Sequence, residues 1–290
     1  MIEASAKGVL AACDERDISI GECTLREECE RSGKSRERLL ARMEEMLFAM
    51  RASVRPGLSE PLRSTSGLTG GDAFRYHRYC QDGEPLCGPV IASAAAMALS
   101  VSEYNAAMGR IVACPTAGSC GIVPAALLSV GEQRGKSDGE LVMALFTASG
   151  VGELIAQNAT IAGAQGGCQA ECGSASAMAA AALVELMGGS PRQAFHAAAM
   201  SIKTVLGLVC DPVGGLVEIP CIKRNASGVA NAILCADLAL GGVESYIPFD
   251  DTVSAMDKVG RAMPAALRET ALGGLAATEA GQRLAQKIKK

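Results

Sequence analysis

Cysteine is the residue type in this sequence with the widest scope for chemistry, and six of the 12 cysteines lie in three glycine-rich segments. These segments are Ala113–Gly121, Gly166–Ser174 and Val209–Asn225. Glycine beside a cysteine lets backbone amides approach the sulfur, and such hydrogen bonds support thiolate-bound iron–sulfur clusters. Proline beside a cysteine restricts the shape of the loop. The segments are therefore candidates for cluster binding, although on local chemistry alone the favoured interpretation is small thiols packed in an apolar core.

The spacing of the cysteines argues against several common metal and redox sites. No CxxC pair occurs in the sequence, whereas zinc ribbons, thioredoxin-like motifs and ferredoxin-type cluster motifs use such pairs. The sequence begins Met-Ile-Glu with no apolar signal region after it, so we expect a cytoplasmic protein. A disulfide framework is then not expected, because that compartment is reducing.

Charge and composition exclude further classes of function. The net charge is -4, aromatic residues make up 3% and tryptophan is absent, so we expect no nucleic-acid binding. Residues 111–131 form a charge-free run that is long enough to span a bilayer, but it contains Pro115 and Pro124. We interpret this run as a buried loop followed by a helix, and we expect no membrane span.

The elements that must position the cysteines are predicted to be helical. Residues 1–65 carry 23 of the 58 charged side chains and are predicted to form a charged helical N-terminal segment, with residues 66–290 as the catalytic domain. An amphipathic helix is expected over residues 35–51, and Pro56 and Pro61 are expected to break the chain after it.

Further helices are predicted over most of the second segment. Ser137 with Glu140, and Ser190 with Gln193, have the pattern of helix-starting capping boxes. The expected helices are residues 89–108, 141–148, 190–206, 226–240, 252–261 and 264–289, the last interrupted at Gly273-Gly274. Few alternating runs typical of strands occur, so the predicted fold class is all-α, with the chemistry in glycine-rich loops.

The cysteine segments resemble those of the α chain of the iron–sulfur-dependent L-serine dehydratases. The resemblance rests on Lys203–Asn225, Asn105–Ser119 and Leu267–Leu275, and it covers roughly residues 65–285. It implies that Cys168, Cys210 and Cys221 hold a [4Fe–4S] cluster whose fourth iron is open to the substrate. The implied reaction removes water from L-serine: the open iron acts as a Lewis acid on the β-hydroxyl, a base removes the Cα proton, and aminoacrylate then gives pyruvate and ammonia.

The same resemblance suggests residues for substrate binding. Thr116 and Ser119 lie in a loop suited to holding the substrate carboxylate, with local turn bonding as the alternative. Lys203 and Asn225 flank the cluster loop and are candidates for binding the carboxylate or the amino group. Arg224 and Lys223 could do the same, but a surface role is as plausible from sequence.

Four other possibilities stay open at this point. Cys172 follows Cys168 by four residues and is an alternative ligand. Lys203 could carry pyridoxal phosphate, but no phosphate-binding loop follows it. The chain could also be a related cluster lyase, such as a cysteine desulfidase, or a cluster-bearing sensor or scaffold without turnover.

The general base is not evident in this sequence. His196 falls in an alanine-rich stretch where a satisfied core histidine is the expected role, and His77 falls in what looks like a charged surface turn. In the resembled family a Ser-Ser-Ser-His-Thr loop of the β chain is thought to reach the active site, and no such stretch occurs here. The implied partners are therefore L-serine and an L-serine dehydratase β chain.

Overall fold

The computed structural model describes residues 3–288, and 13 α-helices account for most of that range. The helices are α1 (Ala6–Arg16), α2 (Ile20–Ser32), α3 (Arg36–Ser59), α4 (Asp72–Asp82), α5 (Gly88–Ala106), α6 (Ile122–Arg134), α7 (Asp138–Asn158), α8 (Gly163–Gly166), α9 (Ser174–Leu186), α10 (Pro191–Thr204), α11 (Cys221–Leu240), α12 (Phe249–Ala262) and α13 (Glu279–Ile288). Within residues 3–288 no strand occurs, and one isolated β-bridge joins Cys210 to Arg268. The predicted all-α class is confirmed.

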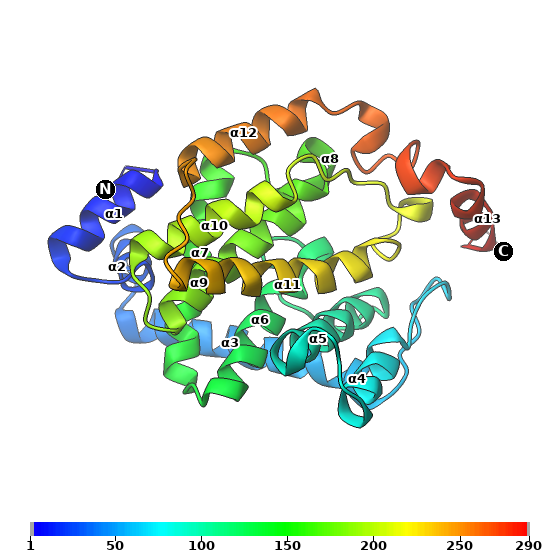
Figure 1. The fold of residues 1–290 in the computed structure, drawn as a ribbon, viewed down its shortest axis with the longest axis horizontal. Coiled ribbons are helices and arrows are strands. Elements are labelled where there is room, and N and C mark those ends of the chain that lie inside the picture. Colours follow the sequence, from blue (N-terminus) through cyan, green and yellow to red (C-terminus); the bar gives the residue numbers. More distant parts are fainter. Residues whose placement is uncertain (1–2, 289–290) are drawn as a thin grey trace.

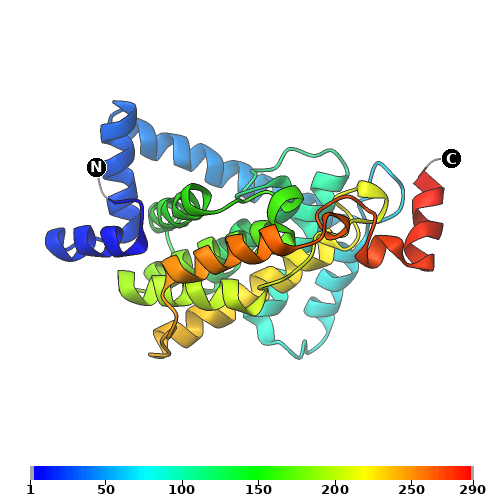
Figure 2. The same ribbon diagram turned by 90° about the horizontal axis from the view of Figure 1, so that it is seen from above.

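Helix α9 forms the centre of the molecule. It packs against α6, α7, α10 and α11, and nearly all of its residues are buried. Alanine fills much of this helix, and its small side chain lets the neighbouring helices approach closely. Around this centre, α12 lies across α10, and α1 and α13 occupy opposite ends of the molecule (Figures 1 and 2).

The N-terminal helices pack onto the same core. The amphipathic pattern predicted over residues 35–51 is confirmed by α3, which buries Leu39, Leu47 and Met50. The predicted break at Pro56 is wrong, because α3 continues through it to Ser59. Proline removes one hydrogen-bond donor, but its carbonyl still accepts from the N–H of Glu60, so a final turn persists. The division of the chain at residue 65 stays a prediction.

Two of the predicted helix starts are confirmed in atomic detail. Ser137 and Glu140 form a reciprocal capping box at the start of α7, and Ser190 and Gln193 form another at the start of α10. In each, the serine hydroxyl accepts from the third residue's N–H while that residue's side chain accepts from the serine N–H. Helix α10 ends at Thr204, slightly before the predicted residue 206.

The predicted long C-terminal helix is wrong over its first half. Residues 264–278 contain only two short 3₁₀ turns, and α13 begins at Glu279. Glu269 and Ala271 have positive φ angles, which an α-helix cannot contain. The reason is tertiary: the backbone of residues 267–269 pairs with Cys210 through two hydrogen bonds, so this stretch is extended beside the third cysteine segment.

The charge-free run of residues 111–131 is a loop followed by α6, as predicted, but only residues 118–121 and Cys114 of the loop are buried, and Ala113 and Ala117 are exposed. Among the described residues, only α7 is long and apolar enough to cross a bilayer. It packs against α2 and α9, and 56% of its apolar stretch is buried inside the protein. Its length and apolar composition are therefore explained by its position as a core helix.

Candidate active site

Three cysteines from three separate segments meet beside the N-terminal end of α9. Cys168 precedes a five-residue π-helix (Gln169–Gly173), Cys210 follows α10, and Cys221 is the first residue of α11. All three are buried, with exposed fractions of 3%, 3% and 8%. They are close enough for the charge of Cys168 to raise the pKa of both Cys210 and Cys221. The structure thus groups the three predicted ligands, and their role as ligands stays a prediction.

The protonation of these thiols depends on their neighbours. The sulfurs of Cys168 and Cys172 are 3.4 Å apart and hydrogen-bonded, which lowers the pKa of Cys168 and raises that of Cys172. The positive charge of Arg224 lowers the pKa of Cys168 further. Burial raises the pKa of Cys210, and it raises that of Cys221 to about 12. Cys168 is therefore the one of the three whose thiolate the protein itself favours.

Arg224 is a largely buried residue that joins two segments of this site. Its guanidinium donates to Asp211 Oδ1 and to the carbonyl of Val209, both at 2.8 Å. The side chains of Arg224 and Asp211 are only 15% and 3% exposed. Asp211 Oδ2 in turn accepts from the N–H of Leu275 at 2.7 Å. Arg224 thus ties the Cys210 loop to α11, a role that its place in a Lys-Arg pair did not reveal.

Glu171 is a second residue whose role the sequence analysis missed. It lies on the π-helix, and its Oε1 accepts a hydrogen bond of 2.7 Å from the Thr116 hydroxyl. A Cβ placed on Gly163 would lie 2.7 Å from Glu171 Oε2 and 3.1 Å from Cys210 Sγ. Burial raises the pKa of Glu171, the Thr116 hydrogen bond opposes this, and Glu269 adds to it. The available signal was a lone acidic residue inside the Gly166–Ser174 segment.

Asn225 fixes one wall of the site. Its Nδ2 donates to the carbonyls of Gly118 and Cys221 at 2.8 and 3.0 Å, and its Oδ1 accepts from Gly121 N at 2.9 Å. All three bonds are buried, and the two to Gly118 and Gly121 connect that loop to the start of α11. Ser119 is fully buried in that loop, 3.3 Å from the Thr116 hydroxyl. Asn225, Thr116 and Ser119 therefore lie together, with their polar atoms already paired inside the protein.

Lys203 and the histidines lie elsewhere. Lys203 Nζ donates to Ser245 Oγ at 2.6 Å, on the loop before α12, and no contact described for it reaches the three cysteines. Its predicted substrate role stays a prediction. His196 Nδ1 accepts from the N–H of Ser245 at 3.2 Å, as expected of a satisfied histidine. His77 is not in a turn, because it belongs to α4, where it contacts Gln81.

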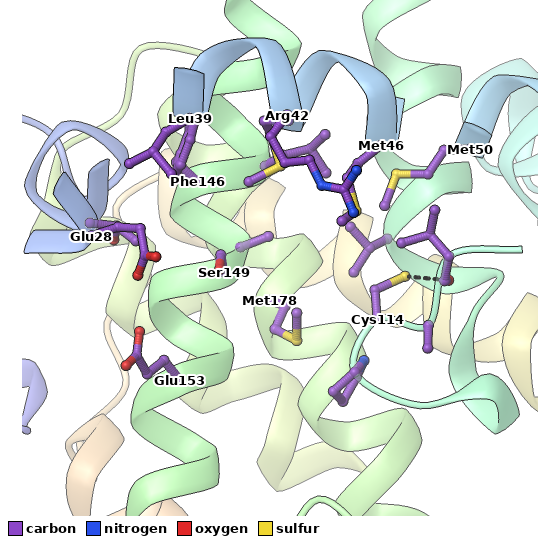
Figure 3. A pocket seen from close by; sticks show the side chains of 18 of the residues that line it. Glu28, Leu39, Arg42, Met46, Met50, Cys114, Phe146, Ser149, Glu153 and Met178 are labelled. Carbon is purple, nitrogen blue, oxygen red and sulfur yellow. Dashed lines mark hydrogen bonds between the residues drawn. The ribbon is translucent and has the colours of Figure 1, made fainter. Parts of the chain in front are cut away.

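A separate apolar pocket of about 330 Å³ lies between α3 and α7 (Figure 3). Met46, Met50, Phe146 and Met178 point into it, and Cys114 closes it on the side of the 111–116 loop. None of the three grouped cysteines lines this pocket, so it is distinct from the site.

Comparison with known proteins identifies the family of this chain. The family described as serine dehydratase alpha chain matches residues 15–276. The chain is 48% identical over 284 residues to a probable L-serine dehydratase, alpha chain, of Bacillus subtilis, covering 98% of this chain and 94% of the relative. It is 48% identical over 280 residues to the L-serine dehydratase, alpha chain, of Peptoniphilus asaccharolyticus, covering 97% and 96%. It is 40% identical to an L-serine dehydratase of Mycobacterium bovis, covering 94% of this chain and 60% of that protein. The chain therefore belongs to the serine dehydratase alpha chain family.

Proposed function

We propose that this chain is the α chain of an L-serine ammonia-lyase, which eliminates water from L-serine to give pyruvate and ammonia, and that Cys168, Cys210 and Cys221 hold its [4Fe–4S] cluster. The observation that carries the proposal is the burial of these three thiols at one place, although they come from segments 42 and 11 residues apart. Family membership and the names of the two alpha-chain relatives support the substrate.

The donor set fits a cluster better than a single ion. Among residues 3–288 no three His, Cys, Asp or Glu side chains are gathered closely enough for one metal ion. Cysteines that hold a cluster bind different irons, so their sulfurs stay farther apart than around one ion. Three cysteine ligands would leave one iron of a four-iron cluster without a cysteine. Cys172, whose sulfur is hydrogen-bonded to that of Cys168 at 3.4 Å, stays the alternative ligand. When bound, such a cluster would supply Lewis-acid chemistry toward the substrate hydroxyl.

Two unpaired buried atoms also support the fit. In the described part of the chain, Ser174 Oγ and Arg268 Nε are buried without a hydrogen-bond partner. Ser174 follows Cys172 by two residues, and Arg268 is bridged to Cys210 through its backbone. Buried donors normally have partners. The sulfur atoms of a cluster would provide acceptors in this part of the protein.

The chain's own residues hold the site in shape. Arg224 places a positive charge beside Cys168 and favours its thiolate. Asn225 fixes the Gly118–Gly121 loop against α11, so that Thr116 and Ser119 keep their positions. A fixed arrangement of this kind positions a small substrate for reaction.

The remaining machinery is assigned to an L-serine dehydratase β chain. The Mycobacterium bovis relative is a longer protein, of which the present chain matches only 60%. Neither histidine of this chain contacts the site, so the base that removes the Cα proton is proposed to come from the partner. A cytoplasmic location stays a prediction.

The test is reconstitution of the chain with iron and sulfide under anaerobic conditions, together with its β chain. We expect about four irons and four sulfides per α chain, and pyruvate formation from L-serine. Assays with L-threonine and L-cysteine distinguish related lyases, since sulfide release from cysteine alone would indicate a desulfidase instead. A bound cluster without turnover of any of the three amino acids would favour a sensor or scaffold.

A further inference from the structure

A half-buried carboxylate without a cationic partner lies beside the grouped cysteines. Glu171 has one hydrogen-bond donor among the described residues, the hydroxyl of Thr116, and that hydroxyl binds Oε1. Its other oxygen, Oε2, has no described donor. Burying a carboxylate away from water is costly unless a positive group or several donors accompany it. Arg224, the cation near this site, is instead committed to Asp211.

The position of Glu171 links it to all of the site thiols. Its negative charge raises the pKa of Cys168, Cys172, Cys210 and Cys221. Gly163 lacks a side chain at the point where Glu171 Oε2 and Cys210 Sγ both approach its backbone. Gly118 likewise leaves room, because a Cβ there would lie 3.0 Å from Glu171 Oε1. Two glycines therefore make space for this carboxylate next to a cluster cysteine.

We infer that Glu171 binds the α-ammonium group of the amino-acid substrate, with Thr116 as the residue that positions it. This inference rests on the proposed function, since it concerns how that site recognises an amino acid rather than a hydroxy acid. A substrate ammonium would supply the missing cation and donate to Oε2. The Thr116 hydroxyl holds Oε1 and so orients the carboxylate. Thr116 then acts on the ammonium side of the substrate, and not on its carboxylate as the sequence suggested.

The experiment compares two unreactive ligands on the reconstituted holoenzyme with its β chain. L-alanine carries the ammonium group, and L-lactate carries a hydroxyl at the same carbon. Neither has a β-hydroxyl to eliminate. Inhibition constants against L-serine, and calorimetric titration, which needs no turnover, give the affinity of each ligand for the wild type and for Glu171→Gln.

Glu171→Gln keeps the size of the side chain and removes its charge. We expect it to weaken L-alanine binding by about 10- to 100-fold, the range for a charge-assisted hydrogen bond, and to raise the KM for L-serine. L-lactate affinity should fall by a smaller factor, since its hydroxyl carries no charge to lose an ion pair and can also donate to the amide oxygen of glutamine. Equal weakening of both ligands would overturn the assignment. So would a fall in kcat with unchanged L-alanine affinity, which would instead identify a base.

Two further variants keep the test decisive. Thr116→Val should weaken L-alanine binding selectively but less than Glu171→Gln does, whereas a carboxylate-binding Thr116 would weaken both ligands equally. Glu185→Gln is the matched control: it removes another half-buried carboxylate, which accepts from Thr147 and from the N–H groups of Ile20 and Gly21, away from the grouped cysteines. It should leave the ratio of the two affinities unchanged. Iron content and melting temperature show whether each variant is intact.

The outcome separates this inference from the proposed function. If the wild-type holoenzyme neither converts L-serine nor binds L-alanine, the proposed function fails. If it does both, and Glu171→Gln leaves the preference for L-alanine over L-lactate intact, only the assignment of Glu171 fails.

Discussion

Two regions of this protein contain a pair of buried, hydrogen-bonded thiols. Cys13 on α1 and Cys23 on α2 form one pair, and Cys168 and Cys172 at the start of the π-helix form the other. In each pair the thiol–thiol hydrogen bond raises one pKa and lowers the other. By burial and pairing alone the two regions are indistinguishable.

The charges around the pairs are alike, but the other cysteines and the backbone differ. Arg16 and Arg26 lower the pKa of Cys23, as Arg224 lowers that of Cys168. Only the second pair is joined by cysteines from two other segments and by glycines that leave space beside them. Buried thiols are common core residues. Additional cysteines from other segments and a shaped backbone are what distinguish a candidate ligand set from ordinary packing.

The largest expected difference between the regions is in cluster binding. Cys168→Ser, Cys210→Ser and Cys221→Ser should each abolish stable binding of iron and sulfide after anaerobic reconstitution, because each removes a thiolate ligand. Cys23→Ser, in the other pair, should retain the full content. Retention of iron and activity in any of the first three would remove that residue from the ligand set. Loss of iron in Cys23→Ser would show that the two thiol pairs do not differ in cluster binding.

The ion pair at the site should have the next largest effect. Arg224→Gln leaves Asp211 buried without its partner, and breaking such a pair costs about 3–5 kcal/mol of unfolding free energy. Denaturant unfolding of the apoprotein measures this. Arg51→Gln is the control, since the Arg51–Asp138 pair is 36% and 65% exposed and is worth about 0–1 kcal/mol. The double variant Asp211→Asn with Arg224→Gln should recover part of the lost unfolding free energy. An equal loss for Arg224→Gln and Arg51→Gln would contradict this account.

Glycine substitutions test the shaped backbone. Gly163→Ala places a methyl group against Glu171 Oε2 and Cys210 Sγ, and crowding of this kind costs about 1–3 kcal/mol. It should also reduce iron incorporation. Gly139→Ala, in the first turn of α7, meets nothing within 4 Å and should be neutral or slightly stabilising. A neutral Gly163→Ala with full iron content would show that the space beside Cys210 is not needed.

The smallest effect concerns the carboxylate of the other region. Burial raises the pKa of Glu185, although Thr147 and the N–H groups of Ile20 and Gly21 donate to it. Because its pKa in the folded state exceeds that in the unfolded state, its contribution to stability is fully present below the unfolded value near 4.3. That contribution is lost as the pH rises through the folded value.

Unfolding free energies measured from about pH 4 to pH 7 should therefore fall more steeply for the wild type than for Glu185→Gln. Gln133→Ala, at an exposed position and without a titratable group, is the control and should keep the wild-type pH dependence. A parallel pH dependence for Glu185→Gln and the wild type would contradict the raised pKa.

Local sequence signals predicted much of the fold. The capping boxes at Ser137 and Ser190 formed as expected because both partners are three residues apart and need no tertiary contact. The signals failed where distant contacts decide the backbone. Residues 264–278 have a helical composition, yet their pairing with Cys210 makes them irregular. Pro56 resembles a helix breaker, yet α3 continues past it because the last turn still closes.

The sequence by itself determined the all-α class, the main helix starts and the three cysteine segments, because periodicity, caps and residue types are local properties. Only the tertiary structure decided which polar groups lie beside those cysteine segments. Arg224 looked like half of a surface Lys-Arg pair and proved to be a buried partner of Asp211. Glu171 was one acidic residue among many and proved to lie between Thr116 and Cys210. The physical reason is that burial and charge pairing depend on which segments lie together in space. Segments that lie together have no fixed separation along the chain.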